Sequence, residues 1–165
     1  MFSKMSPLSR IAFALSLAAA SPAAAQEEHR GFSLDLFGSY FTVTADGDSA
    51  NDEGYGLRGS YRFTNVWAVE GALARLADDD EVWIGDLSAK AYLVDTSRFE
   101  LYALAGPGQF KVPGDEETTF HVGIGAEIAL GDRAYLRPEV RGRWFADDVD
   151  LATFVDYSVG FGWRF

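Results

Sequence analysis

The feature that most constrains the fold is an alternation of apolar and polar residues with a period of two, which recurs from Gly31 onward. Between Tyr55 and Phe63, one set of alternate positions is Tyr, Leu, Gly, Tyr and Phe, and the other is Gly, Arg, Ser and Arg. Successive side chains of a β-strand point to opposite faces, so the pattern predicts strands with one apolar and one polar face. It returns in 82–94, 120–130 and 134–145.

Weaker segments complete a set of strands joined by connections that alternate in character. We expect eight strands, at 31–45, 54–63, 66–76, 82–94, 99–111, 120–130, 134–145 and 153–165. The strand 99–111 is apolar at both sets of alternate positions, so the pattern leaves its facing unassigned. Short connections are expected at 64–65, 95–98 and 131–133, and generally longer, acidic ones at 46–53, 77–81, 112–119 and 146–152.

This organisation predicts an all-β fold, an eight-stranded antiparallel up-and-down transmembrane β-barrel. A sheet that crosses hydrocarbon must close on itself, because an open edge would leave backbone N–H and C=O groups unpaired. We therefore expect the apolar face to contact lipid and both termini to lie on the periplasmic side. Aromatic residues should form a girdle at the two bilayer interfaces. The candidates are Tyr55, Phe63, Trp67, Trp83, Phe120, Trp144 and Trp163.

The N-terminal residues 1–25 are expected to be a secretory signal peptide, followed by the barrel domain at 26–165. Lys4 and Arg10 precede or flank a short apolar run, and Ala23 to Ala25 offer a small-residue cleavage site. The apolar run is too short for a membrane-spanning helix. The net charge of -11 argues against nucleic acid as a partner, and the lack of cysteine excludes disulfides.

The C-terminal segment carries the most specific motif. Alternate positions near the end of the chain are occupied by Tyr157, Val159, Phe161, Trp163 and Phe165. This ladder resembles the terminal strand of bacterial outer-membrane barrels, which implies that the barrel-assembly machinery reads it. Over residues 31 to 165 the chain resembles the small OmpA/OmpX-type barrels. The resemblance implies a monomer in the Gram-negative outer membrane, in contact with its lipid and lipopolysaccharide, with a structural, envelope or surface-interaction role.

The polar face of the predicted strands supplies a candidate site inside the barrel. Its charged residues are Arg58, Arg62, Glu70, Asp86, Lys90, Glu127, Arg137, Glu139, Arg141 and Arg143, with Asp156 placed beside them. Unpaired charges in a narrow interior are costly, so their near balance predicts a mutually paired network that plugs the lumen. The alternative is a narrow, porin-like path for ions or small solutes through rearranged pairs.

Acidic residues gather in the expected long connections. Clustered carboxylates can bind Ca²⁺ or Mg²⁺, but the spacing around Asp46 does not match an EF-hand, and solvated loops are the favoured interpretation. No metal site and no cofactor are predicted. The residues concerned are Asp46, Asp48, Asp52, Glu53, Asp78, Asp79, Asp80, Glu81, Asp115, Glu116, Glu117, Asp147, Asp148 and Asp150.

The sequence offers little for catalysis. Its histidines are His29, near the N-terminus, and His121, expected to face inward. His121 could form a dyad with Glu127 or Glu139, but no G-x-S-x-G elbow is present, and a hydrogen-bonded interior histidine is the favoured interpretation. We therefore predict that the protein is not an enzyme.

A soluble, lipocalin-like barrel that binds a hydrophobic ligand is the rival interpretation. Periodicity alone does not say which face of a barrel is inside, and in a lipocalin the apolar face lines the cavity. The aromatic positions at both strand ends, the terminal ladder and the alternating connections favour the membrane barrel.

Overall fold

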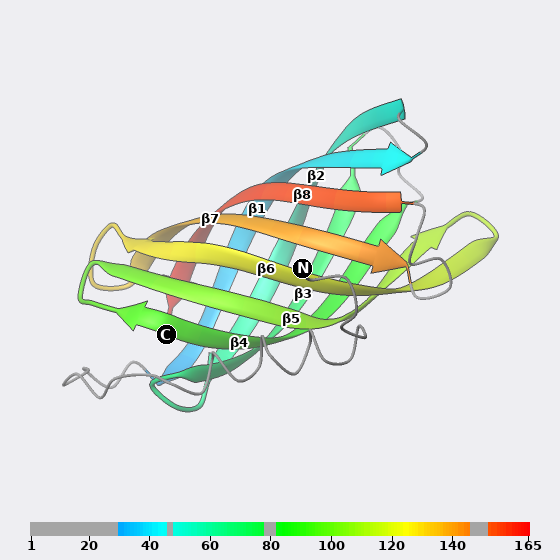
Figure 1. The fold of residues 1–165 in the computed structure, drawn as a ribbon. Helices are drawn as coiled ribbons and strands as arrows, with labels where there is room; N and C mark the ends of the chain where they lie inside the picture. The colour runs from blue at the N-terminus through cyan, green and yellow to red at the C-terminus, as the bar shows by residue number, and fades with distance from the viewer. Residues whose placement is uncertain (1–29, 46–47, 78–81, 146–151) are drawn as a thin grey trace, which may run out of the picture.

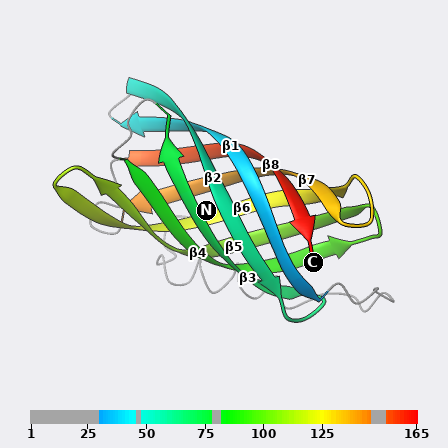
Figure 2. The same ribbon diagram turned by 180° about the vertical axis from the view of Figure 1, so that it is seen from behind.

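The computed structural model describes residues 30–45, 48–77, 82–145 and 152–165, so the predicted signal peptide and His29 lie outside the described residues. Each strand pairs antiparallel with the next, and β8 pairs with β1, which closes the sheet (Figures 1 and 2). The predicted fold class is therefore confirmed. The strands are β1 (Gly31–Ala45), β2 (Asp48–Arg62), β3 (Trp67–Leu76), β4 (Trp83–Asp95), β5 (Phe99–Val112), β6 (Asp115–Ala129), β7 (Ala134–Phe145) and β8 (Ala152–Arg164).

No helix in the described ranges is long and apolar enough to cross a membrane. The first and last strands meet along their whole length, with Ser33 opposite Arg164 and Ala45 opposite Ala152. The two ends of the barrel chain therefore lie on one rim, the rim of the short connections after β2, β4 and β6.

Two predicted loops are wrong, because the strands beside them extend further. β2 begins at Asp48 and β6 at Asp115, so most of the expected connections 46–53 and 112–119 belong to hairpins that project from one end of the barrel (Figure 1). These strand ends are polar at successive positions, and the alternation that marks a half-buried strand is lost there. The β5–β6 hairpin turns at Pro113 and Gly114, where a φ of 86° suits glycine.

The facing of β5, which the sequence left open, is fixed by its pairing with β4 and β6. Tyr102 and Leu104 are buried in the interior, and Phe99 is exposed on the outside. A change of register between Tyr92 and Val94 in β4 turns Leu93 and Val94 outward together. This bulge ends the simple alternation that the sequence pattern assumed.

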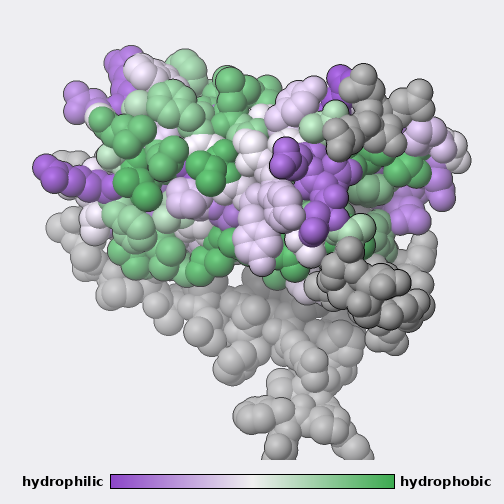
Figure 3. All heavy atoms as spheres, turned by 90° about the horizontal axis from the view of Figure 1, so that it is seen from above, coloured by the Kyte–Doolittle hydropathy of each residue, from purple (hydrophilic) through white to green (hydrophobic). Residues whose placement is uncertain are grey.

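The outside of the barrel is apolar. Leu87 on β4 is 61% exposed and Leu36 on β1 is 67% exposed, and many large apolar side chains share this face. Figure 3 shows them as a band over the half of the barrel toward the short connections, with hydrophilic side chains toward the hairpin end. Such a surface requires a lipid environment, so the lipocalin-like alternative, which needs the apolar face inside, is wrong.

The seven candidate girdle residues all reach the outer surface, near the two ends of the apolar band. Tyr55, Trp83 and Phe120 are exposed toward the hairpin end, and Phe63 and Trp163 toward the opposite rim. The remaining two, Trp67 and Trp144, are half-buried on the same outer face. Their role as an interfacial girdle stays a prediction.

Inside the barrel, aromatic rings cover glycines on the neighbouring strand. Tyr102 on β5 pairs with Gly125 on β6, and Tyr135 on β7 pairs with Gly162 on β8. A Cβ at Gly125 would lie 2.2 Å from the Tyr102 hydroxyl oxygen, and one at Gly162 would lie 2.1 Å from the Tyr135 ring. Glycine is needed at both positions because the ring occupies the space of any side chain.

We expect Gly125→Ala to destabilise the barrel by about 1–3 kcal/mol, because the added methyl displaces the Tyr102 ring from its packed position. Urea titration of the protein in lipid vesicles, followed by heat-dependent gel mobility, measures the change. Gly71→Ala on β3 is the matched control, since its Cβ meets nothing within 4 Å. Equal stability of the two variants would contradict the close packing.

Candidate functional site: the charged interior

Arg137, on β7, lies at the centre of the lumen with no exposed surface. Its Nη1 donates to Asp35 Oδ2 at 2.9 Å, and its Nη2 donates to Glu139 Oε2 at 2.7 Å. The same Nη2 lies 2.7 Å from Glu70 Oε2, and Nε donates to the Tyr102 hydroxyl at 2.6 Å. One guanidinium therefore joins β1, β3, β5 and its own strand across the interior.

Asp86, on β4, gathers the cations on the hairpin side of Arg137. Arg143 grips it with two parallel hydrogen bonds, Nη1 to Oδ1 at 2.6 Å and Nη2 to Oδ2 at 2.8 Å. The charges around Arg137 and those around Asp86 form two tiers, and Arg141 bonds both. It donates to Asp86 at 2.9 Å and to Glu70 at 2.8 Å, and it also bonds Glu139. Such bidentate and shared pairs are the strong form of the charged hydrogen bond.

A third tier of charges lies toward the rim where the barrel chain begins and ends. Arg62 pairs with Glu100 at 2.5 Å and with Asp95 at 2.6 Å. Arg164 contacts Glu100 and lies 2.8 Å from Glu127, which also bonds Lys90. The cations and acids of this tier come from β2, β4, β5, β6 and β8, so it too spans the lumen.

Arg58 and Asp156 lie in the interior on the β1, β2 and β8 side. Arg58 Nη2 donates to the Ser158 hydroxyl at 2.7 Å, and its guanidinium lies 3.8 Å from the centre of the Phe37 ring. Its longer ion pairs reach Glu139 at 3.4 Å and Asp35 at 3.8 Å. Asp156 is buried opposite Arg141 in the register. All residues of the predicted interior set thus face inward.

An apolar layer closes the hairpin end of the interior, which the sequence analysis did not anticipate. Its rings pack closely, with centroids 5.3 Å apart for Phe41 and Phe154 and 6.2 Å apart for Phe110 and Phe154. The sequence contains one sign of this layer. Ile84 lies two residues before Asp86 on β4, so this apolar residue faces the interior on the same side of the strand. The buried members are Phe37, Phe41, Ala74, Leu76, Val82, Ile84 and Phe154.

Sequence reasoning also missed four charged residues of the interior, namely Asp35, Asp95, Glu100 and Arg164. Asp35 is the one charged residue of β1, and Glu100 lies on the strand whose facing was unassigned. Asp95 turns inward because of the bulge, and Arg164 is the polar position next to Trp163 in the terminal ladder. Arg164 was visible in the alternation, and so was Asp35, which alternates with Leu34 and Leu36.

His121 does not bond the carboxylates proposed as its dyad partners, Glu127 and Glu139. Its Nε2 lies 2.8 Å from the Ser88 hydroxyl, and its Nδ1 lies 3.5 Å from Asp86 Oδ1. The order resembles a nucleophile, base and acid, but Arg143 and Arg141 hold Asp86, and both Ser88 and His121 are buried. Among the described residues, neither the hollow on the outer face nor the pocket at the rim of the short connections is lined by Ser88 or His121.

No group of three or more potential ligands (His, Cys, Asp or Glu) is arranged for a metal within the described ranges. Asp52, Glu53, Asp115, Glu116 and Glu117 belong to the projecting hairpins. Asp48 begins β2. The other acidic loop residues lie outside the described residues: Asp46, Asp78, Asp79, Asp80, Glu81, Asp147, Asp148 and Asp150.

The family model of the outer membrane protein beta-barrel domain matches residues 11–165. The chain belongs to this family. Its place is therefore the Gram-negative outer membrane, where the exposed apolar band meets lipid. No curated protein matches the sequence significantly.

Solved structures of small outer-membrane barrels share the fold at low sequence identity. The attachment invasion locus protein Ail of Yersinia pestis, solved with the heparin analogue sucrose octasulfate, is 19% identical with a TM-score of 0.62, covering 82% of this chain and 99% of Ail. Neisserial surface protein A is 17% identical with a TM-score of 0.65, covering 82% and 97%. The barrel domain of Pseudomonas aeruginosa OprF is 13% identical with a TM-score of 0.59, covering 82% and 99%.

We expect Arg137→Met to lower the free energy of unfolding by about 3–5 kcal/mol, because it leaves three buried carboxylates without their shared cation. Urea titration in lipid vesicles with tryptophan fluorescence measures the change. Arg133→Met is the control, since Arg133 is exposed in the connection after β6. If adding Glu70→Gln to Arg137→Met recovered none of the loss, the charge-pair explanation would fail.

Proposed function

We propose that the protein is a structural barrel of the outer membrane whose interior is plugged, with its hairpin end available for contacts at the cell surface. The observation that carries the proposal is the set of ion pairs made by Arg137, which crosses the lumen from β7 to β1 and β3. An eight-stranded barrel has an interior just wide enough for side chains to fill. A solute would have to break these pairs to pass.

The apolar layer around Phe41 and Phe154 supports the same proposal from the other end. It lies between the hairpin end and the Asp86 tier, so ions that enter from outside meet a dehydrated constriction before they reach any charge. Two unlike barriers in series oppose conduction more strongly than either alone.

We expect the purified protein to give no conductance steps in a planar bilayer in which a 16-stranded porin conducts. The double variant Phe41→Ala, Phe154→Ala should also stay closed, because it removes the apolar layer and leaves the Arg137 tier in place. If the wild-type protein gave reproducible conductance steps that Arg137→Met altered, the plugged barrel would be the wrong interpretation and the narrow channel the right one.

Ail was solved with an anionic heparin analogue, and we propose that the hairpin end of this chain does not bind such a ligand. The hairpin end of this chain carries Asp52 and Glu53 on β2, and Asp115, Glu116 and Glu117 on β6. Like charges repel a polyanion at this surface. We infer that partners at this end are neutral or cationic, and that immobilised heparin does not retain the protein.

We also propose that the terminal ladder is the signal for the barrel-assembly machinery, and that the barrel is a monomer without cofactor or catalytic activity. Phe165 supports the first point, because the residue is 72% exposed although its backbone N–H bonds Phe32 O at 2.9 Å. A side chain that packs so little is available for binding by the assembly machinery.

We expect Phe165→Ala to reduce the amount of barrel in the outer membrane several-fold while leaving spontaneous folding into lipid vesicles unchanged. Phe32→Ala is the matched control, since it removes the same ring contact, with centroids 5.8 Å apart, from outside the ladder. Outer-membrane fractionation and heat-dependent gel mobility measure the two effects. Equal losses for both variants in cells would show a packing defect instead of a lost signal.

A further inference from the structure

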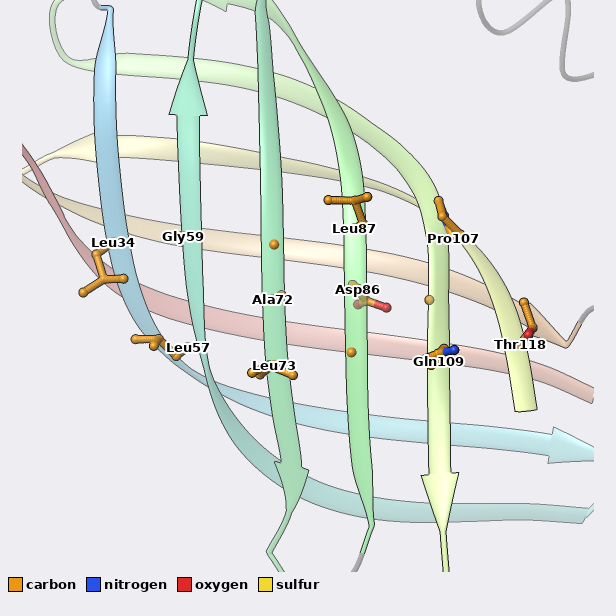
Figure 4. A pocket seen from close by; sticks show the side chains of 13 residues that line it. Leu34, Leu57, Gly59, Ala72, Leu73, Asp86, Leu87, Pro107, Gln109 and Thr118 are labelled. Carbon is orange, nitrogen blue, oxygen red and sulfur yellow. The ribbon is translucent and has the colours of Figure 1, made fainter. Parts of the chain in front are cut away.

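The outer face of β2 to β5 carries a hollow that the plugged-barrel function does not use. Its volume is about 680 Å³, and it crosses the strands from Leu34 on β1 to Thr118 on β6 (Figure 4). Outward glycines on three neighbouring strands form its floor, namely Gly59, Gly71 and Gly85. Leucines on four strands stand around them.

The register shows why the hollow forms where it does. Gly59 on β2 is opposite Gly71 on β3, and Gly71 is opposite Leu87 on β4. In the next row, Leu57 is opposite Leu73, and Leu73 is opposite Gly85. Neighbouring strands lie about 4.8 Å apart, so the apolar part of the hollow, from Leu34 on β1 to Pro107 on β5, is roughly 19 Å long. This length suits a single extended hydrocarbon chain.

The end of the hollow toward the hairpins becomes polar. Gly85 is opposite Gln109 on β5, and Gln109 is opposite Thr118 on β6; both polar side chains are exposed and line the hollow. One more row toward the hairpins, Arg75 is opposite Trp83, and Trp83 is opposite Lys111. Arg75 lies 5.7 Å from the centre of the Trp83 ring, and Lys111 is exposed.

The outer face thus combines an apolar trough, a polar end and two cations flanking an aromatic ring, in that order toward the cell surface. We propose that it is a binding site for the phosphorylated, multiply acylated glycolipid of the outer leaflet. An acyl chain fills the trough, Gln109 and Thr118 meet the ester and sugar groups, and Lys111 and Arg75 meet a phosphate.

The position of the cations favours this glycolipid over an inner-leaflet phospholipid. The cations lie on the hairpin side of the trough, so a chain that enters beneath them comes from the outer leaflet. The nearest acid in the register, Glu116 opposite Lys111, weakens the attraction for any anion. A phosphate with up to two charges still binds, because charge-assisted hydrogen bonds from Arg and Lys are strong.

The test is native mass spectrometry of the refolded barrel in nonionic detergent, titrated with bis-phosphorylated lipid A. Lys111→Gln removes a cation and should lower the affinity about tenfold, as expected for one charge-assisted hydrogen bond. Glu116→Gln should raise the affinity. Arg98→Gln, at an exposed cation in the connection after β4, is the control and should change nothing.

The trough is tested by Gly71→Leu, which fills it without touching the cations. A Cβ at Gly71 meets nothing within 4 Å, and Gly38→Leu on the outer face of β1 is the matched control, since its Cβ would lie 4.0 Å from the nearest atom. Gly71→Leu should weaken both lipid A and dephosphorylated lipid A, whereas Lys111→Gln should weaken only the phosphorylated form. Heat-dependent gel mobility verifies that each variant is folded.

Two results would overturn the proposal. The first is equal binding of lipid A by the wild-type protein, Lys111→Gln and Gly71→Leu. The second is binding of phosphatidylglycerol as tightly as lipid A, which would assign the face to anionic phospholipid in general. Neither result bears on the plug, because conductance is measured independently of lipid binding.

Discussion

The pairing of β1 with β8 is the constraint on which the rest of the structure depends. Hydrocarbon offers no hydrogen bonds, so a sheet in the membrane has to satisfy every backbone group within itself, and only the closed ladder does so. Once it closes, alternate residues of each strand must face either lipid or a narrow lumen. The apolar outer band and the crowded charges around Arg137 are two consequences of the same closure.

Most of the fold could be predicted from the sequence because lipid imposes a strict pattern on the strands. Where one face is apolar and the other is charged, as at Leu57 beside Arg58, both the strand and its facing follow from the sequence. The interior positions of Arg137, Glu139 and Arg141 could be read from the sequence for the same reason. Their partners could not, because pairs such as Arg137 with Asp35 join residues a hundred positions apart.

The parts that sequence reasoning missed lie where this pattern fails. The hairpin ends at Asp48 and Asp115 project beyond the lipid, so both of their faces can be polar. The layer around Phe41 is apolar on the inner face, which makes the two faces of β1 alike there. The outer trough is a matter of register, since Gly59, Gly71 and Gly85 become neighbours only after three strands are aligned.

The ion pairs across the lumen also set the order in which the barrel can assemble. Arg137 joins β7 to β1 and β3, and Arg164 joins β8 to β5 and β6, so neither can make all of its ion pairs while the sheet is open. Contacts between residues so distant in sequence form late. An open intermediate would carry unpaired charges along its inner face, and its closing step neutralises many of them together. We therefore expect closure of the barrel to be a cooperative step.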